Sequence, residues 1–172
     1  LINVGRFTEQ KDHFTLLKGV NLIKNKINFK LIIIGRGKNY LKMKDFINEN
    51  DLKKKVKILK FLKNPFPYIK SAHVFVLTST FEGLPNVLLE ASVLKKFIIS
   101  SKCQTGPSEI LLNGKGGLLF GIRNYKQLAN KILFYASNKS KCDKMRRRTY
   151  NNLWRFDKKN NLEKYKNLFV NL

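Results

Sequence analysis

Short apolar runs alternate with longer amphipathic segments along this chain, and this alternation limits what it can fold into. Six runs have the length and composition of β-strands: Leu1–Gly5, Leu31–Gly35, Val56–Leu59, Val74–Thr78, Phe97–Ser101 and Leu118–Phe120. Leu31–Ile34 and Val74–Leu77 have no polar face, which is typical of parallel strands that helices cover on both sides. The pattern therefore predicts a parallel sheet.

The segments between these runs have helical spacing. From Asp12 to Ile27, apolar residues recur on one stripe, with Asp12 as the candidate N-cap. Pro85 and Pro107 stand where the first turn of a helix tolerates proline. Because strand and helix alternate, we expect an α/β fold with a Rossmann-like doubly wound parallel sheet. The other predicted helices are Tyr40–Asn50, Phe66–Ser71, Pro85–Lys95 and Ser108–Leu112.

From Tyr125 onward the pattern becomes all-helical. We expect a Rossmann-like α/β domain over residues 1–136 and a helical segment of the same domain over 137–172, since 172 residues suit one domain. The 43% hydrophobic residues exclude a disordered chain. Cys103 and Cys142 form no CxxC pair, which argues against a disulfide framework or a cysteine-based zinc site. No uncharged apolar run approaches the roughly 20 residues of a membrane-spanning helix.

The chain carries 35 Lys and Arg against 11 Asp and Glu, a formal net charge of +24. Nucleic-acid modules usually concentrate Arg and aromatic residues on one face. Here 28 of the 35 cations are Lys, scattered along the chain, and the one dense cluster is Lys144–Arg148. We therefore expect no nucleic-acid partner and keep that function as the weakest alternative. Two explanations of the charge stay open: contact with an anionic membrane surface, or a solvated Lys-rich surface set by codon bias.

The unusual residues follow the predicted strands, where open parallel sheets bind their ligands. Four strand ends supply glycines, cations or carboxylates: Gly5-Arg6 with Lys11, Gly35-Arg36-Gly37, Ser79–Pro85 and Thr105–Glu109. The second of these is no dinucleotide fingerprint, because that motif needs a glycine at the position of Tyr40. By themselves, its glycines indicate a tight turn from strand to helix.

The most specific segment is Phe81–Ala91, FEGLPNVLLEA. Pro85 starts a predicted helix whose free N–H groups face the strand ends, an arrangement that suits phosphate. Glu82 precedes this helix and Glu90 lies on its second turn, so the two carboxylates can bind hydroxyls at the two ends of one ligand. The alternative is that Glu90 pairs with a surface Lys.

Gly5-Arg6-Phe7 with Lys11, the stretch from Glu82 to Glu90, and Gly106–Glu109 together resemble the C-terminal nucleotide-sugar-binding domain of family 4 retaining glycosyltransferases, also called glycosyl transferases group 1. The resemblance runs in order from residue 1 to about residue 136, and more loosely over Trp154, Phe156 and the helix at 162–165. The Glu-x7-Glu pattern is highly specific, and the Gly-Arg-x4-Lys pattern is moderately so. The resemblance implies the C-terminal half of a two-domain GT-B-type enzyme that builds lipopolysaccharide, capsule or another glycan.

The resemblance also implies roles for the matching residues. Arg6 and Lys11 would hold the donor diphosphate as leaving group and Glu82 would lie beside the transferred sugar, which makes these three the expected catalytic residues. Glu90 would accept hydrogen bonds from the ribose. The expected donor-binding residues are Gly5, Gly35, Lys60, Phe61, Gly83, Leu84, Pro85, Asn86 and Glu90. The backbone of residues 83–86 would contact the sugar and β-phosphate, and that of 60–61 the base.

Elementary chemistry supports the same site. Sugar transfer from a nucleotide diphosphate develops negative charge on the departing phosphate, which enzymes stabilise with a carboxylate-bound metal or with fixed cations and helix dipoles. The sequence has no Asp-x-Asp pair but has Arg6, Lys11 and a helix start. We therefore predict transfer without a metal or other cofactor.

The chain opens on Leu1 without an initiator Met or signal peptide, so we expect it to be part of a larger protein. In enzymes of the resembled family, an acceptor-binding domain precedes this one. We expect the chain to bind a UDP-linked nucleotide sugar and to transfer little or no sugar by itself; the alternative is a non-catalytic nucleotide-sugar-binding module. The acceptor is expected to be a glycan or a lipid-linked one, reached in the cytoplasm at the inner face of the membrane.

Overall fold

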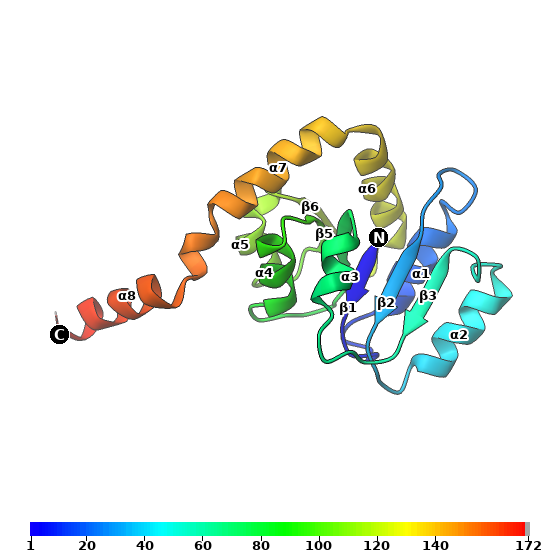
Figure 1. Cartoon of the computed structure of the whole chain (residues 1–172), viewed down its shortest axis with the longest axis horizontal. Coiled ribbons are helices and arrows are strands. Elements are labelled where there is room, and N and C mark those ends of the chain that lie inside the picture. Colours follow the sequence, from blue (N-terminus) through cyan, green and yellow to red (C-terminus); the bar gives the residue numbers. More distant parts are fainter. Residues whose placement is uncertain (171–172) are drawn as a thin grey trace.

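Six parallel strands form one sheet at the centre of the computed structural model, which describes residues 1–170, the side chains of 164, 165 and 168–170 excepted (Figure 1). The strands are β1 (Ile2–Val4), β2 (Leu31–Ile34), β3 (Val56–Leu59), β4 (Val74–Leu77), β5 (Phe97–Ser101) and β6 (Leu118–Phe120). All six expected strands are confirmed. Strand β1 is shorter than expected by one residue at each end, and β2 and β4 each end one residue earlier than expected.

The strand order is β3-β2-β1-β4-β5-β6. The chain builds the sheet outward from β1 to β3, then returns to the other side of β1 and continues outward to β6. The point where the direction reverses lies between β1 and β4, where Ile2 pairs with Phe75. In doubly wound sheets, the crevice outside the carboxyl ends at this reversal is where ligands bind.

Helices cover both faces of the sheet. On one face lie α1 (His13–Asn21), α2 (Tyr40–Glu49) and α6 (Tyr125–Ser137); on the other lie α3 (Phe66–Ser71), α4 (Asn86–Val93) and the short α5 (Pro107–Ile110). Successive residues of one strand enter different cores: Val76 packs in the first and Phe75 in the second. Strands β2 and β4 thus lack a polar face because helices cover both sides of the sheet, as the sequence predicts.

Helix α1 ends at Asn21, and the prediction that it reaches Ile27 is wrong. Beyond Asn21, the N–H groups of Ile23, Lys24 and Lys26 bond to carbonyls three residues earlier, so the chain tightens into turns. The side chains of Asn21 and Lys24 bond to Asn50 at the end of α2, at 2.8 and 2.9 Å. At the other end the prediction is confirmed, because the Asp12 carboxylate accepts a hydrogen bond from the N–H of Thr15 at 3.2 Å.

Three further helices also have boundaries that differ from those expected. Helix α4 begins at Asn86, with Pro85 as its N-cap in an extended conformation, and ends at Val93. It stops two residues before Lys95, which has a left-handed backbone (φ 55°) and cannot continue a helix. Helix α2 ends at Glu49, and α5 covers 107–110 where 108–112 was expected.

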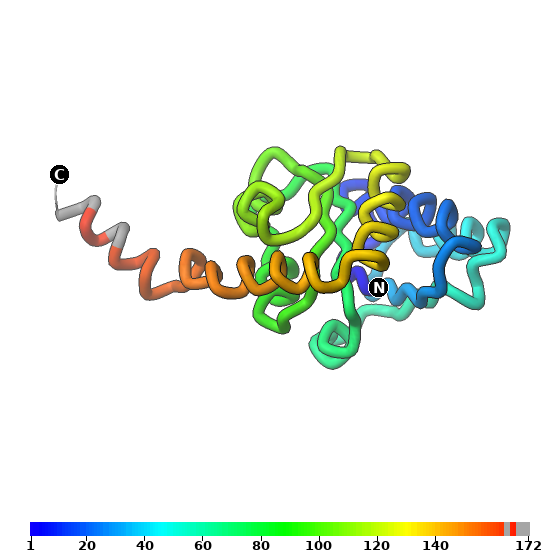
Figure 2. Tube along the Cα trace, turned by 90° about the horizontal axis from the view of Figure 1, so that it is seen from above, coloured from blue at the N-terminus to red at the C-terminus, as the bar shows by residue number. Residues whose placement is uncertain are grey.

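The C-terminal part is helical, as expected: a 3-10 turn η1 (Leu112–Gly114) precedes β6, and α6 is followed by α7 (Lys139–Asn151), η2 (Leu153–Phe156) and α8 (Lys158–Val170). Helix α7 packs on β5 and α4, and its Thr149 hydroxyl donates to the carbonyl of Gly116 at 2.8 Å. Helix α8 extends away from the sheet (Figures 1 and 2). The end of the expected helix Asn161–Leu172, residues 171–172, lies outside the described residues, as do the side chains of 164 and 165.

Candidate functional site

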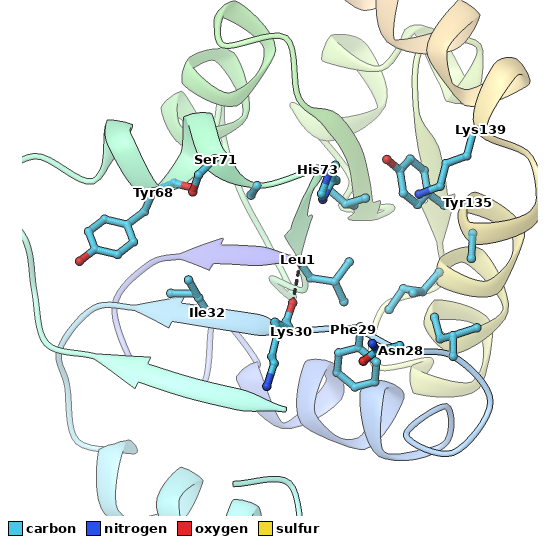
Figure 3. A pocket seen from close by; sticks show the side chains of 15 residues that line it. Leu1, Asn28, Phe29, Lys30, Ile32, Tyr68, Ser71, His73, Tyr135 and Lys139 are labelled. Carbon is cyan, nitrogen blue, oxygen red and sulfur yellow. Dashed lines mark hydrogen bonds between the residues drawn. The ribbon is translucent and has the colours of Figure 1, made fainter. Parts of the chain in front are cut away.

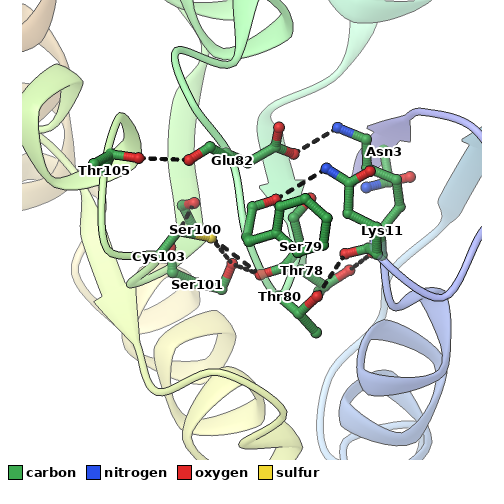
Figure 4. Close-up of polar contacts among 12 residues, drawn as sticks. Asn3, Lys11, Thr78, Ser79, Thr80, Glu82, Ser100, Ser101, Cys103 and Thr105 are labelled. Carbon is green, nitrogen blue, oxygen red and sulfur yellow. Dashed lines mark hydrogen bonds and ion pairs between the residues drawn. The ribbon is translucent and has the colours of Figure 1, made fainter.

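The loops that follow β1 and β4 are bonded to each other at the reversal point of the sheet (Figure 4). The N–H of Thr80 donates to the carbonyl of Gln10 at 2.8 Å, and the amide of Gln10 donates to the carbonyl of Phe81 at 3.0 Å. The hydroxyl of Thr78 donates to the carbonyl of Lys11 at 2.9 Å. These bonds place two loops that are about seventy residues apart in the sequence side by side.

Lys11 and Glu82 face each other across these loops. The Nζ of Lys11 lies 2.5 Å from Oε1 of Glu82, and the two side chains are only 16% and 8% exposed. The stem of Lys11 passes over the backbone of Gly5, since a Cβ on Gly5 would lie 3.7 Å from its Cγ and Cδ. The structure thus brings together two of the three expected catalytic residues in a largely water-shielded ion pair.

The loop after β5 supports Glu82 from the other side. The hydroxyl of Thr105 donates to the carbonyl of Glu82 at 2.6 Å. Gly106 has a left-handed backbone (φ 77°), and a Cβ there would lie 2.0 Å from the carbonyl oxygen of Gly83. Only glycine fits this approach, which explains why the segment Gly106–Glu109 is part of the motif.

The loop after β2 contacts the loop after β1 through its backbone. A Cβ on Gly35 would lie 1.9 Å from the carbonyl oxygen of Gly5, so a side chain at position 35 is excluded. The N–H of Phe7 donates to the carbonyl of Arg36 at 2.8 Å, and that of Asn39 to the carbonyl of Phe7 at 3.1 Å. Gly5 and Gly35, both expected at the site, are therefore in close backbone contact.

Two expected binding residues have free charged groups. Arg6 is exposed, and its guanidinium forms no hydrogen bond or ion pair with any described residue. Glu90 is partly buried on the second turn of α4 and likewise has no polar partner among the described residues, so the alternative of a surface Glu90–Lys pair is not formed. Gly83, Leu84 and Asn86 are exposed at the start of α4, whereas Pro85 is buried.

A cavity of about 350 Å³ lies between the ends of β1, β2 and β3 and contains Lys60 and Phe61, the expected base-contacting residues. The Arg36 guanidinium lies 4.9 Å from the centre of the Phe61 ring. Phe7 and Tyr40 stack with their ring centres 6.3 Å apart. Sequence reasoning missed the part of Arg36 and Tyr40 here, although Arg36 stands between two glycines of a strand-end turn. The lining is Phe7, Gly35, Arg36, Gly37, Tyr40, Lys60 and Phe61.

His13, the first residue of α1, is a buried group that sequence reasoning did not single out. Its side chain is 1% exposed, both ring nitrogens lack a hydrogen-bond partner, and the ring meets Phe7 edge-on at 5.2 Å between centres. Burial, together with the nearby positive charge of Lys11, lowers the pKa of His13 from 6.5 to about 4. His13 therefore stays neutral behind the cationic loop.

Buried polar contacts behind the loop after β4 also hold it in place. The carbonyl of Ser79 accepts hydrogen bonds from the hydroxyl of Ser101 at 2.6 Å and from the thiol of Cys103 at 3.2 Å. Burial is the main reason that the pKa of Cys103 is raised above its usual value. Cys103 and Cys142 are both free and buried.

A second cavity, of about 480 Å³, lies at the opposite edge of the sheet, where the strands begin (Figure 3). Its lining includes the three residues that immediately precede β1, β2 and β4, which are Leu1, Lys30 and His73. Tyr68 and Tyr135 also line it. It has none of the glycine turns or paired charges found at the carboxyl edge. We therefore place the candidate site at the carboxyl edge.

Two further findings concern the described residues as a whole. No three His, Cys, Asp or Glu side chains among them converge in a way that could hold a metal ion. No helix within the described part of the chain has both the length and the apolar character that crossing a bilayer requires.

Comparisons with known proteins complete the description. The model of the family glycosyl transferases group 1 matches residues 1–152. An uncharacterized glycosyltransferase of Methanocaldococcus jannaschii is 43% identical over 111 residues, which are 64% of this chain and 27% of that protein. The N-acetylgalactosamine-N,N'-diacetylbacillosaminyl-diphospho-undecaprenol 4-alpha-N-acetylgalactosaminyltransferase of Campylobacter jejuni is 30% identical over 72% of this chain and 33% of its own length. The chain thus spans about a third of these curated relatives.

Among solved structures, the chain is similar to that of a TarM variant of Staphylococcus aureus in complex with fondaparinux, alpha-GlcNAc-glycerol and UDP. The TM-score is 0.89 at 24% identity, over 98% of this chain and 35% of that one. This likeness confirms the expected Rossmann-like fold of a GT-B glycosyltransferase half.

Proposed function

The chain belongs to the glycosyl transferases group 1 family, and we propose that it is the donor-binding half of a retaining glycosyltransferase. The proposed reaction transfers a hexose or N-acetylhexosamine from a nucleotide diphosphate sugar, with UDP as the preferred nucleotide, to a cell-envelope or lipid-linked glycan. One observation carries the proposal: Arg6, Lys11, Glu82 and Glu90 belong to the loops and the helix at the reversal point of the sheet, where this fold binds its ligands.

The cations of the site would stabilise the diphosphate leaving group. Arg6, exposed and unpaired, and Lys11, at the end of a rigid loop, would hold the diphosphate as negative charge develops on it. The free N–H groups at the start of α4 add the positive end of a helix dipole. These groups are the basis for proposing transfer without a bound metal, which predicts that a chelator leaves the turnover of the two-domain enzyme unchanged.

The two carboxylates would accept hydrogen bonds from the hydroxyl groups of the donor. Glu90 has no partner among the described residues, and a partly buried carboxylate in this state is suited to accept hydrogen bonds from a ribose. Glu82 would accept hydrogen bonds from the transferred sugar, and it is followed in the chain by residues 83–86, of which Gly83, Leu84 and Asn86 are exposed. The retaining outcome is proposed from the Glu-x7-Glu pattern that Glu82 and Glu90 form.

The nucleobase would occupy the cavity beside Phe61. That cavity is open and mostly apolar, and its Arg36 guanidinium already lies over an aromatic ring. A flat base can stack there while its edge reaches the backbone at Lys60 and Phe61. The loop Gly5–Phe7 connects this cavity, which Phe7 lines, to Gly5 beside the Lys11 side chain.

The acceptor would be bound by a second α/β domain. The chain spans only about a third of its curated relatives, which leaves room for such a domain in the complete enzyme. The name of the C. jejuni relative specifies a diphospho-undecaprenol-linked acceptor, and this supports a lipid-linked glycan for the present chain. The coding sequence upstream of Leu1 is expected to encode the acceptor-binding domain.

We propose that the chain attaches to the inner face of the cytoplasmic membrane, and its charge supports this proposal. The net charge is +24, and the exposed side chains of Lys144, Arg147 and Arg148 lie on α7. We expect the chain to sediment with vesicles containing phosphatidylglycerol at low salt and to be released at high salt. Equal sedimentation with pure phosphatidylcholine vesicles would contradict this part of the proposal.

The direct test is titration of the isotope-labelled chain with UDP, GDP and a short oligonucleotide, followed by NMR. We expect UDP to shift the signals of Lys11, Glu90 and the loop at Phe61, with GDP weaker. Salt-sensitive shifts with the oligonucleotide alone would overturn the proposed function and favour nucleic-acid binding. A complete enzyme that binds the donor but transfers no sugar would instead support the non-catalytic binding module.

A further inference from the structure

The ion pair between Lys11 and Glu82 uses up both charges before any ligand arrives. Lys11 is proposed to bind the diphosphate and Glu82 the sugar, yet in the structure they bind each other at 2.5 Å. Among the ion pairs of the described residues, this is the one in which both side chains are less than a fifth exposed. A donor therefore has to break this pair in order to bind.

The other carboxylates of the loop that carries Lys11 are already engaged. The neighbouring Asp12 carboxylate is engaged by Thr15, through its N–H at 3.2 Å and its hydroxyl at 2.6 Å. Glu9 pairs with Lys38 at 3.0 Å on the surface. A carboxylate that is 8% exposed receives little help from water, so Glu82 without a partner raises the free energy of the complex.

The loops permit an exchange of partners without moving their backbones. The carbonyl of Glu82 is held by Thr105 at 2.6 Å, and the Gln10 side chain holds the carbonyl of Phe81 at 3.0 Å (Figure 4). The two charged groups lie at the ends of flexible side chains on this fixed frame. Rotation of these side chains is enough to separate them.

We propose that the Lys11–Glu82 pair is an exchange device that makes the site prefer an intact nucleotide sugar over the nucleoside diphosphate that remains after transfer. The β-phosphate takes Lys11 away from Glu82, and hydroxyls of the sugar replace Lys11 at Glu82. A nucleoside diphosphate takes Lys11 but offers nothing to Glu82, so its binding leaves a buried carboxylate unpaired. The pair thus promotes release of the product. This inference rests on the proposed function.

The test is calorimetric titration of this chain with UDP, in the wild type, in Glu82→Gln and in the matched control Glu9→Gln. The control removes the same charge from the exposed pair with Lys38, where the side chains are 82% and 70% exposed. Because Glu82→Gln frees Lys11 and leaves no buried carboxylate behind, we expect it to bind UDP about tenfold more tightly than the wild type. Glu9→Gln is expected to bind within about twofold of the wild type.

The second arm uses a panel of UDP-glucose, UDP-galactose, UDP-GlcNAc and UDP-GalNAc. For each sugar nucleotide that the wild type binds, its affinity relative to that of UDP is expected to fall in Glu82→Gln. Should the wild type bind UDP while Glu82→Gln shows no gain, the exchange device is wrong and the proposed function stands. If neither UDP nor any sugar nucleotide of the panel binds to any of the three proteins, the proposed function fails and the exchange device with it.

If Glu82→Gln does not fold, an NMR measurement on the wild type still tests the proposal. The side-chain ammonium signal of Lys11 and the carboxyl carbon signal of Glu82 are followed by NMR during the UDP titration. The exchange predicts that both signals change together, because one partner cannot leave without the other. A Glu82 signal that stays constant while Lys11 shifts would overturn the proposal.

Discussion

Individual charged side chains, above all Lys11 and Arg6, determine how the candidate site binds a diphosphate. Lys11 is buried enough to be shielded from water, whereas Arg6 is exposed and free. A fixed, partly desolvated cation stabilises a diphosphate more than a surface lysine does, since the local dielectric is lower. The excess of surface lysines therefore adds little to the chemistry.

Replacement of Lys11 by Ala is expected to weaken UDP binding about a hundredfold, equivalent to about 3 kcal/mol, because one fixed donor to the diphosphate is lost. In the two-domain enzyme the same change lowers turnover by orders of magnitude. The matched control is Lys38→Ala, which removes an exposed cation of the neighbouring loop. Isothermal titration calorimetry measures both; equal UDP affinities of the two variants would contradict the role of Lys11.

His13 predicts a pH dependence of stability. Its pKa in the folded protein is lowered to about 4 from 6.5, so the unfolded chain takes up a proton in the range where the folded protein does not. The contribution of neutral His13 is complete above pH 6.5 and is lost as the pH falls from 6.5 to 4, by about 3 kcal/mol. In His13→Phe, which keeps the contact with Phe7, this loss is absent.

Urea unfolding at pH 7 and pH 4 tests this prediction. The difference in unfolding free energy between His13→Phe and the wild type is expected to grow in favour of the variant as the pH falls. His73→Asn, which changes the exposed histidine of the chain, is the control. A constant difference between His13→Phe and the wild type at both pH values would show that His13 is not the buried titrating group.

At the scale of elements, the loops after the strands act as one unit because their backbones touch. The loop after β1 is bonded to the loops after β2 and β4, and the loop after β5 lies against that after β4. Glycine at two of these contacts lets the backbones approach more closely than any side chain allows. The position of Lys11 thus depends on neighbouring loops as much as on its own.

Gly35→Ala is expected to lower the unfolding free energy by about 2–4 kcal/mol, because its Cβ would lie 1.9 Å from the carbonyl oxygen of Gly5. Gly5→Ala is the matched control on the adjacent strand end. Its Cβ would make ordinary contacts with the side chain of Lys11 at 3.7 Å. Denaturant unfolding compares the two variants, and equal losses would mean that the loops can separate at no cost.

At the scale of the whole molecule, the sheet and the C-terminal helices differ in how firmly they are attached. Helix α7 buries Cys142 and Thr149 against the rest of the domain and packs on β5 and α4. Helix α8 packs chiefly on η2 and extends outward (Figure 2). The domain core therefore includes α7 but depends little on α8.

Truncated chains test whether the domain core needs α7 but not α8. A chain ending at Asp157 is expected to keep its thermal midpoint within about 2 °C and its UDP affinity unchanged, because little apolar surface is exposed. A chain ending at Asn138 loses α7 and exposes its partners on β5 and α4, so its midpoint falls much further. Differential scanning calorimetry gives both values. A large loss on removal of α8 alone would contradict the prediction.

The sequence by itself determined the six strands and the fold class, because apolar periodicity is a property of short segments. The expected site residues came from short motifs that resemble a known family, and their roles remain predictions. It placed the end of α1 wrongly, since the bonds of Asn21 and Lys24 to Asn50 involve a distant helix. It also assigned no role to Arg36, Tyr40 or His13, whose surroundings come from several loops.

Only the tertiary structure decided that Lys11 and Glu82 form an ion pair across 71 positions of sequence. Both residues were expected at the site, but their contact depends on β1 lying beside β4 in the sheet. The physical reason is that a strand's tendency to form is local, whereas the choice of its neighbour is made by packing of the whole sheet.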